Sequence, residues 1–458
     1  MAQYDIAILG GGPGGYVAAI RAAQKGAKTV LIEEESLGGV CLNVGCIPTK
    51  TLLRSAQAYQ EVVQAARFGV VVQGEVKVDW AAVLGRKDKV VKQLTGGVAQ
   101  LLKHNGVKVI NGRGTVKDKH TIEVGGTAVT ANNLIIATGS RPMMLPIPGL
   151  EEAAASGAVV DSTGALNLSQ IPKRFIVVGG GVIGIEFAAL FQALGSEVIV
   201  LEKFSILNGL DKDVQDLMRR ILKREGVQIF EEADVQRFEG STVVVKVGDE
   251  VHLFTGDAVL VSLGRIPNTE AADSLGLALE GRGIKTNERM ETSVPGVYAI
   301  GDVNGKQMLA HTASAEGIVA VENILGGSAQ VDYHKIPACV YSFPEIAVVG
   351  LTEEAARERG HDVQTGTFPF AANGKALAEG ERDGFVKIVA DRQYGEILGV
   401  HIVGPYATDL IAEAANALQL EATLSDLAQT IHPHPTLSEA LMEAAHAGLG
   451  MPIHVANR

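Results

Sequence analysis

Cysteine, basic charge and long apolar runs are all scarce in this sequence. Three cysteines in 458 residues do not make a secreted scaffold held by disulfide bonds. The net charge of −12 argues against nucleic acid and against anionic membrane surfaces as partners. No apolar run is long enough to span a membrane, and no basic leader precedes the first predicted strand. We therefore expect a cytoplasmic protein that binds neither nucleic acid nor membrane.

Glycine, by contrast, is in excess. It accounts for 54 of the 458 residues, about 12% against a usual share of about 7%. Such an excess fits many tight turns and close backbone approaches to ligands. The length is too great for a single core, so two to four domains are expected.

The first glycine-rich motif, Gly10-x-Gly12-x-x-Gly15, lies between a short apolar strand and an Ala-rich helix. Gly10 permits a tight turn, Gly12 lets a pyrophosphate approach, and Gly15 lets helix and strand pack closely. The phosphate would rest on the helix N-terminus. Glu33 ends the next predicted strand and can accept hydrogen bonds from ribose hydroxyls. Together these elements predict a dinucleotide-binding unit.

The same pattern recurs, displaced by 169 positions, as Gly179-x-Gly181-x-x-Gly184 followed by a strand that ends at Glu202. An internal repeat of this kind predicts two dinucleotide sites, most economically one for FAD and one for a nicotinamide nucleotide. Glu202 can accept from a ribose 2′-hydroxyl and would repel a 2′-phosphate. No cluster of arginines follows it, so NAD(H) is favoured over NADP(H).

Cys41 and Cys46 lie just downstream of the first glycine motif. A disulfide between them would close a small ring and stabilise the fold little, which favours a reversible redox pair. Pro48 suits the first turn of a helix, whose N-terminus would stabilise a Cys46 thiolate. The alternatives are two unpaired core cysteines or half of a metal site. The Cys-x2-Cys spacing and the further ligands that a metal site needs are not found.

The segment from Gly38 to Lys50 resembles the active-site signature of the flavin-dependent pyridine nucleotide–disulfide oxidoreductases, and most of all that of the dihydrolipoamide dehydrogenases. The resemblance implies an α/β fold with two Rossmann-like dinucleotide-binding domains, for FAD and NAD, and a C-terminal α+β interface domain. The domains it implies are a first part of the FAD domain at 1–145, the NAD domain at 146–270, a central domain at 271–336 and the interface domain at 337–458.

The resemblance also assigns the cofactors. The first glycine motif would hold FAD and the second NAD, with Lys50 and Glu186 converging near the flavin. Further cofactor contacts are implied at Gly114, Gly139, Val235, Gly264, Asp302 and Ala310. The remaining cysteine, Cys339, is expected to be a buried apolar residue.

A His-Pro-His-Pro-Thr-Leu-Ser-Glu segment near the C-terminus contains a candidate base. Dithiol–disulfide exchange needs a base that titrates near neutral pH, and histidine is the natural one. By resemblance the base is His434, oriented by Glu439, and it serves the cysteines of the other subunit of a homodimer. His432 is then a bystander, although spacing alone does not exclude it. The prolines confine any helix to the residues after Pro435, with Thr436 as its expected cap and Glu439 completing a capping box.

The function implied by the resemblance is oxidation of protein-bound dihydrolipoamide, with electrons passing through the Cys41–Cys46 pair and FAD to NAD⁺. Cys41 would exchange with substrate and Cys46 would face the flavin. The implied partners are lipoyl domains and the core acyltransferase of a 2-oxoacid dehydrogenase complex, or a glycine cleavage complex. The alternatives are a glutathione reductase-like or mercuric reductase-like enzyme, or a non-catalytic flavoprotein that senses NADH.

Overall fold

The computed structural model describes residues 2–456, which divide into two compact units. The first unit comprises the chain up to Pro146 with Val160–Ile171 and Val261–Val331, and the second comprises Ile147–Val159, Pro172–Leu260 and the chain from Asp332 onward. Across the described residues, no helix combines the length and apolar character that crossing a membrane requires.

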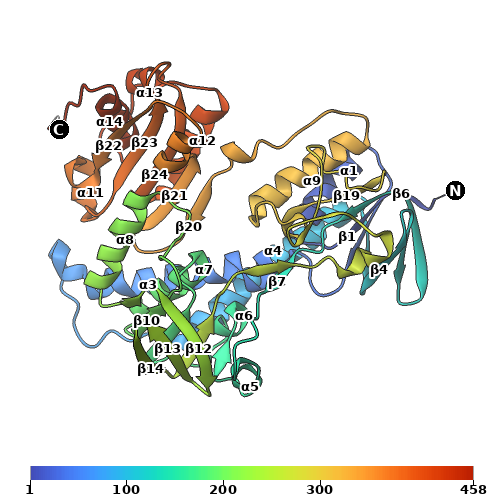
Figure 1. The fold of residues 1–458 in the computed structure, drawn as a ribbon, viewed down its shortest axis with the longest axis horizontal. Coiled ribbons are helices and arrows are strands. Elements are labelled where there is room, and N and C mark those ends of the chain that lie inside the picture. The colour runs from blue at the N-terminus through green and yellow to red at the C-terminus, as the bar shows by residue number, and fades with distance from the viewer. Residues whose placement is uncertain (1, 457–458) are drawn as a thin grey trace. The chain divides into compact units, whose positions relative to one another are not determined.

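A parallel sheet forms the centre of the first unit (Figure 1). Its parallel strands, in spatial order, are β3 (Lys108–Asn111), β2 (Thr29–Glu33), β1 (Tyr4–Leu9), β6 (Thr127–Ile136) and β19 (Val297–Ala299). The antiparallel strands β4 (Gly114–Asp118) and β5 (Thr121–Val124) extend it beside β6. Ile6 and Ile8 are buried in one core cluster and Ala7 and Leu9 in another. Because both faces are covered, the strand is a continuous apolar run.

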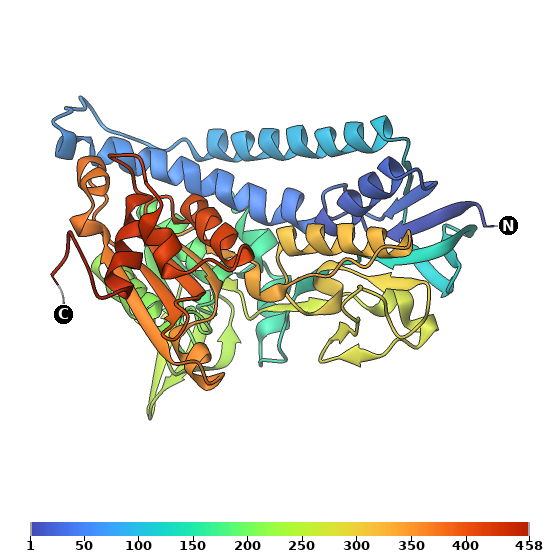
Figure 2. The same ribbon diagram turned by 90° about the horizontal axis from the view of Figure 1, so that it is seen from above.

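The helices of the first unit are α1 (Pro13–Gln24), α2 (Gly39–Val44), α3 (Cys46–Val63), α4 (Trp80–His104), α6 (Ser162–Ala165) and α9 (Ala310–Ile324). Of these, α1 packs against β1 and β2, and α4 packs against β3. The contact between α1 and α9 is close because it is made by glycine: a Cβ added at Gly317 would lie 2.7 Å from the Gly14 carbonyl oxygen. The long helices α3 and α4 run side by side (Figure 2). The α4 helix also holds the segment after α6, since buried Lys87 donates to the Leu166 carbonyl at 3.1 Å.

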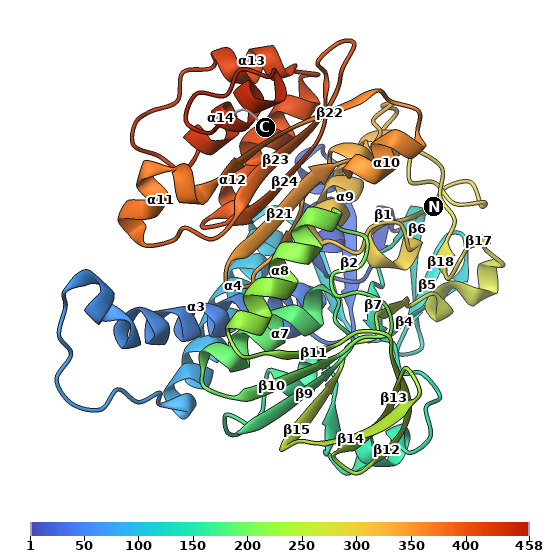
Figure 3. The ribbon, with the colours of Figure 1, turned by 60° about the vertical axis from the view of Figure 1, so that its left-hand side comes forward.

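The second unit repeats the nucleotide-binding architecture (Figure 3). Its sheet has the order β11 (Gln228–Phe230), β10 (Glu197–Leu201), β9 (Arg174–Val178), β15 (Ala258–Val261) and β8 (Val159–Val160). Its helices are α5 (Leu150–Ala155), α7 (Val182–Ala193) and α8 (Lys212–Arg224), and a three-stranded meander is formed by β12 (Ala233–Glu239), β13 (Thr242–Val247) and β14 (Glu250–Thr255). The α7 helix begins and ends 169 positions after α1, which confirms the predicted internal repeat.

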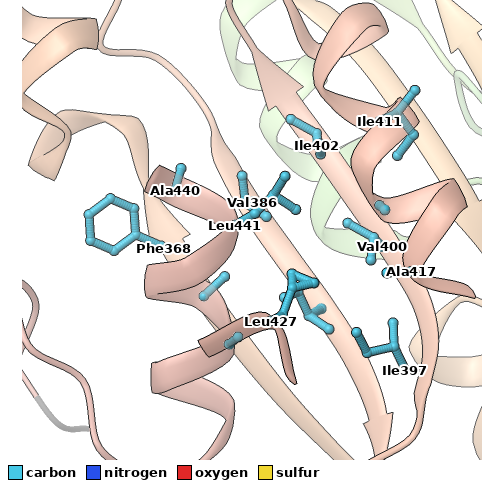
Figure 4. Close-up of a cluster of buried hydrophobic side chains, with 14 of the residues drawn as sticks. Phe368, Val386, Ile397, Val400, Ile402, Ile411, Ala417, Leu427, Ala440 and Leu441 are labelled. Atoms are coloured by element: carbon cyan, nitrogen blue, oxygen red, sulfur yellow. The ribbon is translucent and has the colours of Figure 1, made fainter. Parts of the chain in front are cut away.

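The C-terminal part of the second unit is an antiparallel sheet with helices (Figure 1). Its strand order is β20 (Ala338–Val340), β21 (Glu345–Gly350), β24 (Ile397–Gly404), β23 (Phe385–Asp391) and β22 (Val363–Pro369). Its helices are α10 (Glu353–Glu358), α11 (Gly374–Glu379), α12 (Ala407–Gln419), α13 (Leu424–Gln429) and α14 (Glu439–Gly448). Side chains such as Phe368, Val386, Ile402 and Leu441 fill the core between sheet and helices (Figure 4). The predicted fold class is confirmed.

Short elements complete the chain. The crossing strands β7 (Ser140–Pro142) and β16 (Arg265–Pro267) pair antiparallel, as do β17 (Leu279–Glu280) and β18 (Gly283–Ile284). Short 3₁₀ helices lie at η1 (Ala65–Phe68), η2 (Glu270–Leu275), η3 (Gly301–Asn304), η4 (Tyr333–Lys335) and η5 (Phe370–Ala372).

Candidate active site

The two redox cysteines occupy adjacent helices separated by Gly45. Cys41 lies in α2, and Cys46 is the first residue of α3, as predicted. Both are half-buried and in the thiol form. A side-chain hydrogen bond with Cys46, together with burial, raises the pKa of Cys41 well above its usual range. The proton is therefore held on Cys41. Cys46 is the first residue of α3, a position at which the helix N-terminus stabilises negative charge.

Glycines seat this pair on the first nucleotide loop. Gly38 and Gly39 have φ of +93° and +56°, a left-handed backbone that glycine adopts without strain. A Cβ at Gly39 would lie 2.7 Å from the Gly12 Cα, and the Gly38 N–H donates to the Gly11 carbonyl at 2.8 Å. The Gly-Gly dipeptide before the cysteines is thus required by close contact with the loop.

The first glycine loop fits a dinucleotide. Gly12 is the N-cap of α1, no side chain caps this helix end, and a Cβ at Gly12 would meet only the Gly39 Cα, at 3.9 Å. The helix N-terminus therefore presents an open cradle of backbone N–H groups, which suits a pyrophosphate. Gly15 has the predicted packing role, because its Cβ would lie 1.9 Å from the Gly10 carbonyl oxygen. Glu33 ends β2 and accepts from the Gly11 N–H at 2.6 Å.

The second loop has the same geometry. Gly179 has the same φ as Gly10, +106°. Gly181 caps α7 with no atom within 4 Å of an added Cβ, and Gly184 is buried in that helix. Glu202, just after β10, accepts from the Gly180 N–H at 2.6 Å. Each loop thus presents an uncapped helix N-terminus with room beside its central glycine, so the residues fit the pyrophosphates of FAD and NAD(H), the two predicted occupants.

A polar cluster joins three crossing segments of the first unit. Asp302, in η3 after β19, accepts from the Ser140 hydroxyl. Arg265 donates to the Ser140 Oγ and to the Ser140 carbonyl, each at 2.7 Å, and lies 3.9 Å from Asp302. The sequence analysis proposed a cofactor role for Asp302 but gave none to Arg265 and Ser140. They stand beside the predicted Gly264 and Gly139, and only the pairing of β7 with β16 brings them together.

The other predicted cofactor residues have varied surroundings. Gly114 is buried in β4, where a Cβ would lie 2.5 Å from the Leu9 side chain, so packing alone requires glycine. Gly139 and Gly264 have positive φ at the crossings. Ala310 is the first residue of α9, and Val235 lies at a bulge in β12.

Lys50 and Glu186 belong to different units of the structure. Lys50 is half-buried one helical turn after Cys46, where its charge lowers the pKa of Cys41 against the larger effects that raise it. Glu186 is buried in α7 and accepts from the Tyr341 N–H at 3.0 Å. Their predicted approach to each other stays a prediction.

The predicted dyad is formed in the C-terminal domain. The His434 Nδ1 lies 2.9 Å from the Glu439 Oε1, and the imidazole is 79% exposed. Burial opposes ionisation of Glu439, but the Thr436 N–H and His434 outweigh it and lower the pKa of this carboxyl. Glu439 thus remains an acceptor that holds one ring nitrogen of His434. Because the imidazole is largely exposed, its second ring nitrogen is accessible to a thiol.

The helix after this segment begins later than predicted. The α14 helix starts at Glu439 with Ser438 at its N-cap, so the expected capping by Thr436 is wrong. The Thr436 hydroxyl instead bonds the Pro433 carbonyl and Ser438, which keeps the turn irregular. Half of the capping box is nevertheless made, because the Thr436 N–H donates to the Glu439 Oε2 at 2.7 Å.

His432 has a different environment from His434. Its side chain is 4% exposed, with Nε2 2.7 Å from Glu413 and Nδ1 2.9 Å from the Thr430 carbonyl. With both ring nitrogens engaged, it has none to offer a substrate. A further pair that sequence reasoning missed joins exposed His454 to buried Glu443 at 2.7 Å. Separated by eleven positions, these two residues carry no local signal.

Cys339 is half-buried rather than buried. It lies in β20 and packs against the edge of the C-terminal core. A short strand at the border of the sheet leaves part of its surface uncovered.

Comparison with known proteins identifies one family over nearly the whole chain. Residues 4–317 match the family described as pyridine nucleotide-disulphide oxidoreductase, and residues 336–445 match its dimerisation domain. The chain is 44% identical over 465 residues to a dihydrolipoyl dehydrogenase of Geobacillus stearothermophilus, covering 99% of this chain and 98% of the relative. Identity to a dihydrolipoyl dehydrogenase of Thermus scotoductus is 45% over 469 residues, covering all of both.

A solved structure shows the same fold. The HOCl-induced flavoprotein disulfide reductase RclA from Escherichia coli superposes with a TM-score of 0.84 and is 30% identical. The match covers 96% of this chain and 99% of that protein.

Proposed function

Because this chain belongs to the pyridine nucleotide-disulphide oxidoreductase family, we propose that Cys41, Cys46 and His434 oxidise the dithiol of a dihydrolipoyl group, with NAD⁺ as final acceptor. The activity is that of a dihydrolipoyl dehydrogenase, which uses FAD and NAD(H). It is not that of the glutathione reductase-like, mercuric reductase-like or sensor alternatives. The observation that carries the assignment of residues is the hydrogen-bonded Cys41–Cys46 pair at the start of α3.

The two cofactors are assigned by position. The loop at Gly10, Gly12 and Gly15 holds FAD, since Gly39 at the start of the cysteine-bearing segment touches Gly12. The loop at Gly179, Gly181 and Gly184 holds NAD(H). When bound, the flavin accepts two electrons from the dithiol and delivers them to NAD⁺ as a hydride.

The exchange begins with the cysteine pair in its disulfide form. His434 takes the proton from a lipoyl thiol, and the resulting thiolate attacks the Cys41 sulfur. The Cys41–Cys46 bond breaks, and Cys46 leaves as a thiolate stabilised by the α3 N-terminus. The second lipoyl thiol then attacks the lipoyl sulfur of the mixed disulfide and passes its proton to Cys41. The bond between the lipoyl sulfur and Cys41 breaks, which releases the oxidised lipoyl group and leaves Cys41 as a thiol. The two electrons now reside on the cysteine pair in its reduced form, the form in which both thiols are free of a disulfide.

The base is proposed to act across a homodimer. The family's dimerisation domain spans residues 336–445 and so includes the dyad. Exposed apolar side chains surround the dyad in sequence: Ile431 is 94%, Met451 60% and Ile453 65% exposed. Apolar side chains this exposed favour a covering partner. We place His434 of one subunit beside the Cys41 of the other.

The larger assembly and the domain boundaries are proposed from the same resemblance. The partners are lipoyl domains and the core acyltransferase of a 2-oxoacid dehydrogenase complex, or of a glycine cleavage complex, in the cytoplasm. The domains are proposed at 1–145, 146–270, 271–336 and 337–458.

Steady-state assays test the function. Purified protein is given dihydrolipoamide with NAD⁺, and in parallel oxidised glutathione with NADPH. NADH formation in the first assay and silence in the second is the expected result. Activity only in the second would contradict the assignment of the NAD(H) loop.

The cross-subunit site is tested by mixing inactive Cys41→Ser and His434→Gln subunits after dissociation. Partial recovery of activity is expected, because one heterodimer site regains both residues. No recovery in confirmed heterodimers would mean that each site uses residues of one chain.

A further inference from the structure

The strands β10 and β11 are neighbours in the nucleotide-binding part of the second unit (Figure 3). A pocket lies at their carboxyl ends. Its volume is about 460 Å³, and its lining residues are Lys203, Phe204, Ser205, Glu231 and Glu232. It begins one residue after Glu202, the carboxylate proposed to accept from the adenosine ribose. The 2′ position of a bound nucleotide would therefore face this pocket.

An arginine stands directly behind the pocket wall. Arg219, on α8, donates from Nε to the Glu231 Oε2 at 2.8 Å and from Nη2 to the Glu231 Oε1 at 2.9 Å. Its remaining nitrogen, Nη1, donates to Asp216 at 2.7 Å. Arg219 and Glu231 are largely buried, with side chains 23% and 25% exposed. All three guanidinium nitrogens thus bind carboxylates.

This arrangement matters because a guanidinium fork binds a phosphate as readily as a carboxylate. Glu231 occupies that fork and keeps its own charge on the pocket side. Burial opposes its ionisation, but hydrogen bonds from Arg219 and the Ile206 N–H outweigh burial and lower the pKa of this carboxyl. The other cation of the pocket, Lys203, pairs with Asp234 at 3.3 Å but is 67% exposed. The exposed Lys203–Asp234 pair is therefore much weaker than the Arg219–Glu231 pair.

We infer that Glu231 is a specificity residue that keeps NADP(H) out by holding Arg219 away from the 2′-phosphate, in addition to the direct repulsion from Glu202. The inference rests on the proposed function in one respect, that NAD(H) binds at the second glycine loop. No sequence motif indicates this role. Arg219 lies within α8, well after Glu202 in the sequence, and outside the loop that distinguishes the two nucleotides.

The test is a binding measurement on the purified, FAD-loaded protein. Calorimetry gives dissociation constants for 5′-AMP and 2′,5′-ADP (adenosine 2′,5′-bisphosphate), which differ only by the 2′-phosphate. Glu231→Gln keeps an acceptor for the Ile206 N–H but removes the charge. In this variant, 2′,5′-ADP should bind about tenfold more tightly, the scale of one charge-assisted hydrogen bond. The affinity for 5′-AMP should stay constant, which also shows that the pocket is intact.

Two further variants identify the cause. Glu231→Gln combined with Arg219→Met should lose the gain, because the released guanidinium is then absent. Glu197→Gln is the matched control: Glu197 lies at the other end of β10 and holds Arg174 in the same two-bond geometry, at 2.8 and 3.0 Å. It should leave both dissociation constants unchanged.

The outcomes that contradict the inference are distinguishable. Unchanged 2′,5′-ADP affinity in Glu231→Gln would overturn the inference while leaving the proposed function standing. A gain that persists without Arg219 would also overturn it, since loss of negative charge alone would then explain the result. A wild-type protein that binds neither 5′-AMP nor NAD⁺ would overturn the placement of NAD(H) at this loop, and the inference with it.

Discussion

The two nucleotide loops share one backbone frame and lead into different segments of chain. In the first, the Gly38 N–H donates to the Gly11 carbonyl at 2.8 Å; in the second, the Leu207 N–H donates to the Gly180 carbonyl at 2.9 Å. Both donors have positive φ, +93° and +53°. The repeat therefore extends from the glycine motif through the residue that turns back onto the loop.

Beyond that residue the two regions diverge. The first continues into α2 and α3, which place Cys41 and Cys46 against the loop. The second continues into Asp211, which caps α8. The same nucleotide-binding frame is thus followed by the redox cysteines in the first copy. In the second copy it is followed by Asp211, which belongs to a buried ion cluster that we call the anchor.

The anchor is a buried ion cluster in the second unit. Lys387, on β23, donates to Asp211 at 3.0 Å, to Asp213 at 2.6 Å and to Glu353 at 2.9 Å. Burial opposes its charge, but the three carboxylates outweigh burial and raise the pKa of Lys387. Burial also opposes ionisation of Asp211, but His401 and Lys387 outweigh it and lower the pKa of this carboxyl. The start of α8 is thereby fixed to the C-terminal sheet.

The largest expected effect is on the redox pair. Cys41→Ser should lower dihydrolipoamide oxidation by about 10⁴-fold, because no sulfur remains to exchange with substrate. FAD content, read from the flavin absorbance, should be unchanged. Cys339→Ser, on the edge strand β20, is the control and should keep full activity. A normal rate in Cys41→Ser would remove Cys41 from the mechanism.

The next effect concerns the base. His434→Gln should reduce turnover by about 10³-fold, within the range for loss of a general base. His432→Gln and His454→Gln are matched controls, since each histidine also pairs with a glutamate. Both should stay close to the wild-type rate. Equal losses in all three variants would indicate damage to the domain rather than to a base.

The anchor should affect stability and not chemistry. Lys387→Met should lower the free energy of unfolding by about 3 kcal/mol near neutral pH, because it leaves Asp211 buried and unpaired. The exposed pair Lys246–Asp249, at 3.8 Å, supplies the control Lys246→Met, which should change it by less than about 0.5 kcal/mol. Urea unfolding measures both. A Lys387→Met protein with unchanged stability and reduced turnover would contradict this prediction, because the ion cluster would then contribute to catalysis and not to stability.

The Lys387–Asp211 pair predicts that the free energy of unfolding depends on pH. The pKa of Asp211 is depressed in the folded state, so its contribution is present above the unfolded value of about 3.9. That contribution is lost as the pH falls through the folded pKa. The gap in stability between wild type and Lys387→Met should therefore narrow below about pH 4, in urea titrations repeated across pH. If the difference in stability between wild type and Lys387→Met did not change with pH, the loss of stability in the variant would be due to packing and not to the charge of Asp211.

The smallest effect separates the loops themselves. Gly12→Ala should weaken FAD binding and Gly181→Ala NAD⁺ binding, each by about tenfold, because a methyl group enters the space of a pyrophosphate. Neither Cβ meets an atom closer than 3.9 Å, so both proteins should fold. Gly96→Ala, in open space on α4, is the control for added methyl groups. Loss of one cofactor in both loop variants would contradict the assignment of two sites.

Much of this molecule could be predicted from the sequence because its signals are local. The two glycine motifs, the acids that end β2 and follow β10, and the Cys41–Cys46 spacing each lie within one βαβ unit or directly beside it. Short-range sterics and helix-terminus electrostatics decide such features, so the structure confirmed the repeated unit of strand, glycine motif and helix and the place of Cys46 at the start of α3. The cap at Thr436 was wrong because neighbouring groups compete for the same hydroxyl.

Contacts between distant segments could not be predicted, since they depend on how the whole chain packs. His432 and His434 stand two positions apart and look alike in the sequence, yet only Glu413, on α12, shows that one of them is fully engaged. The Arg265–Ser140 and Lys387–Asp211 contacts likewise join segments more than a hundred residues apart. Local patterns determined the dinucleotide frames and the redox pair, because their chemistry is written within a few turns of chain. Long-range packing chose the partner of each charge, because burial forces charges to pair with whatever the fold brings near.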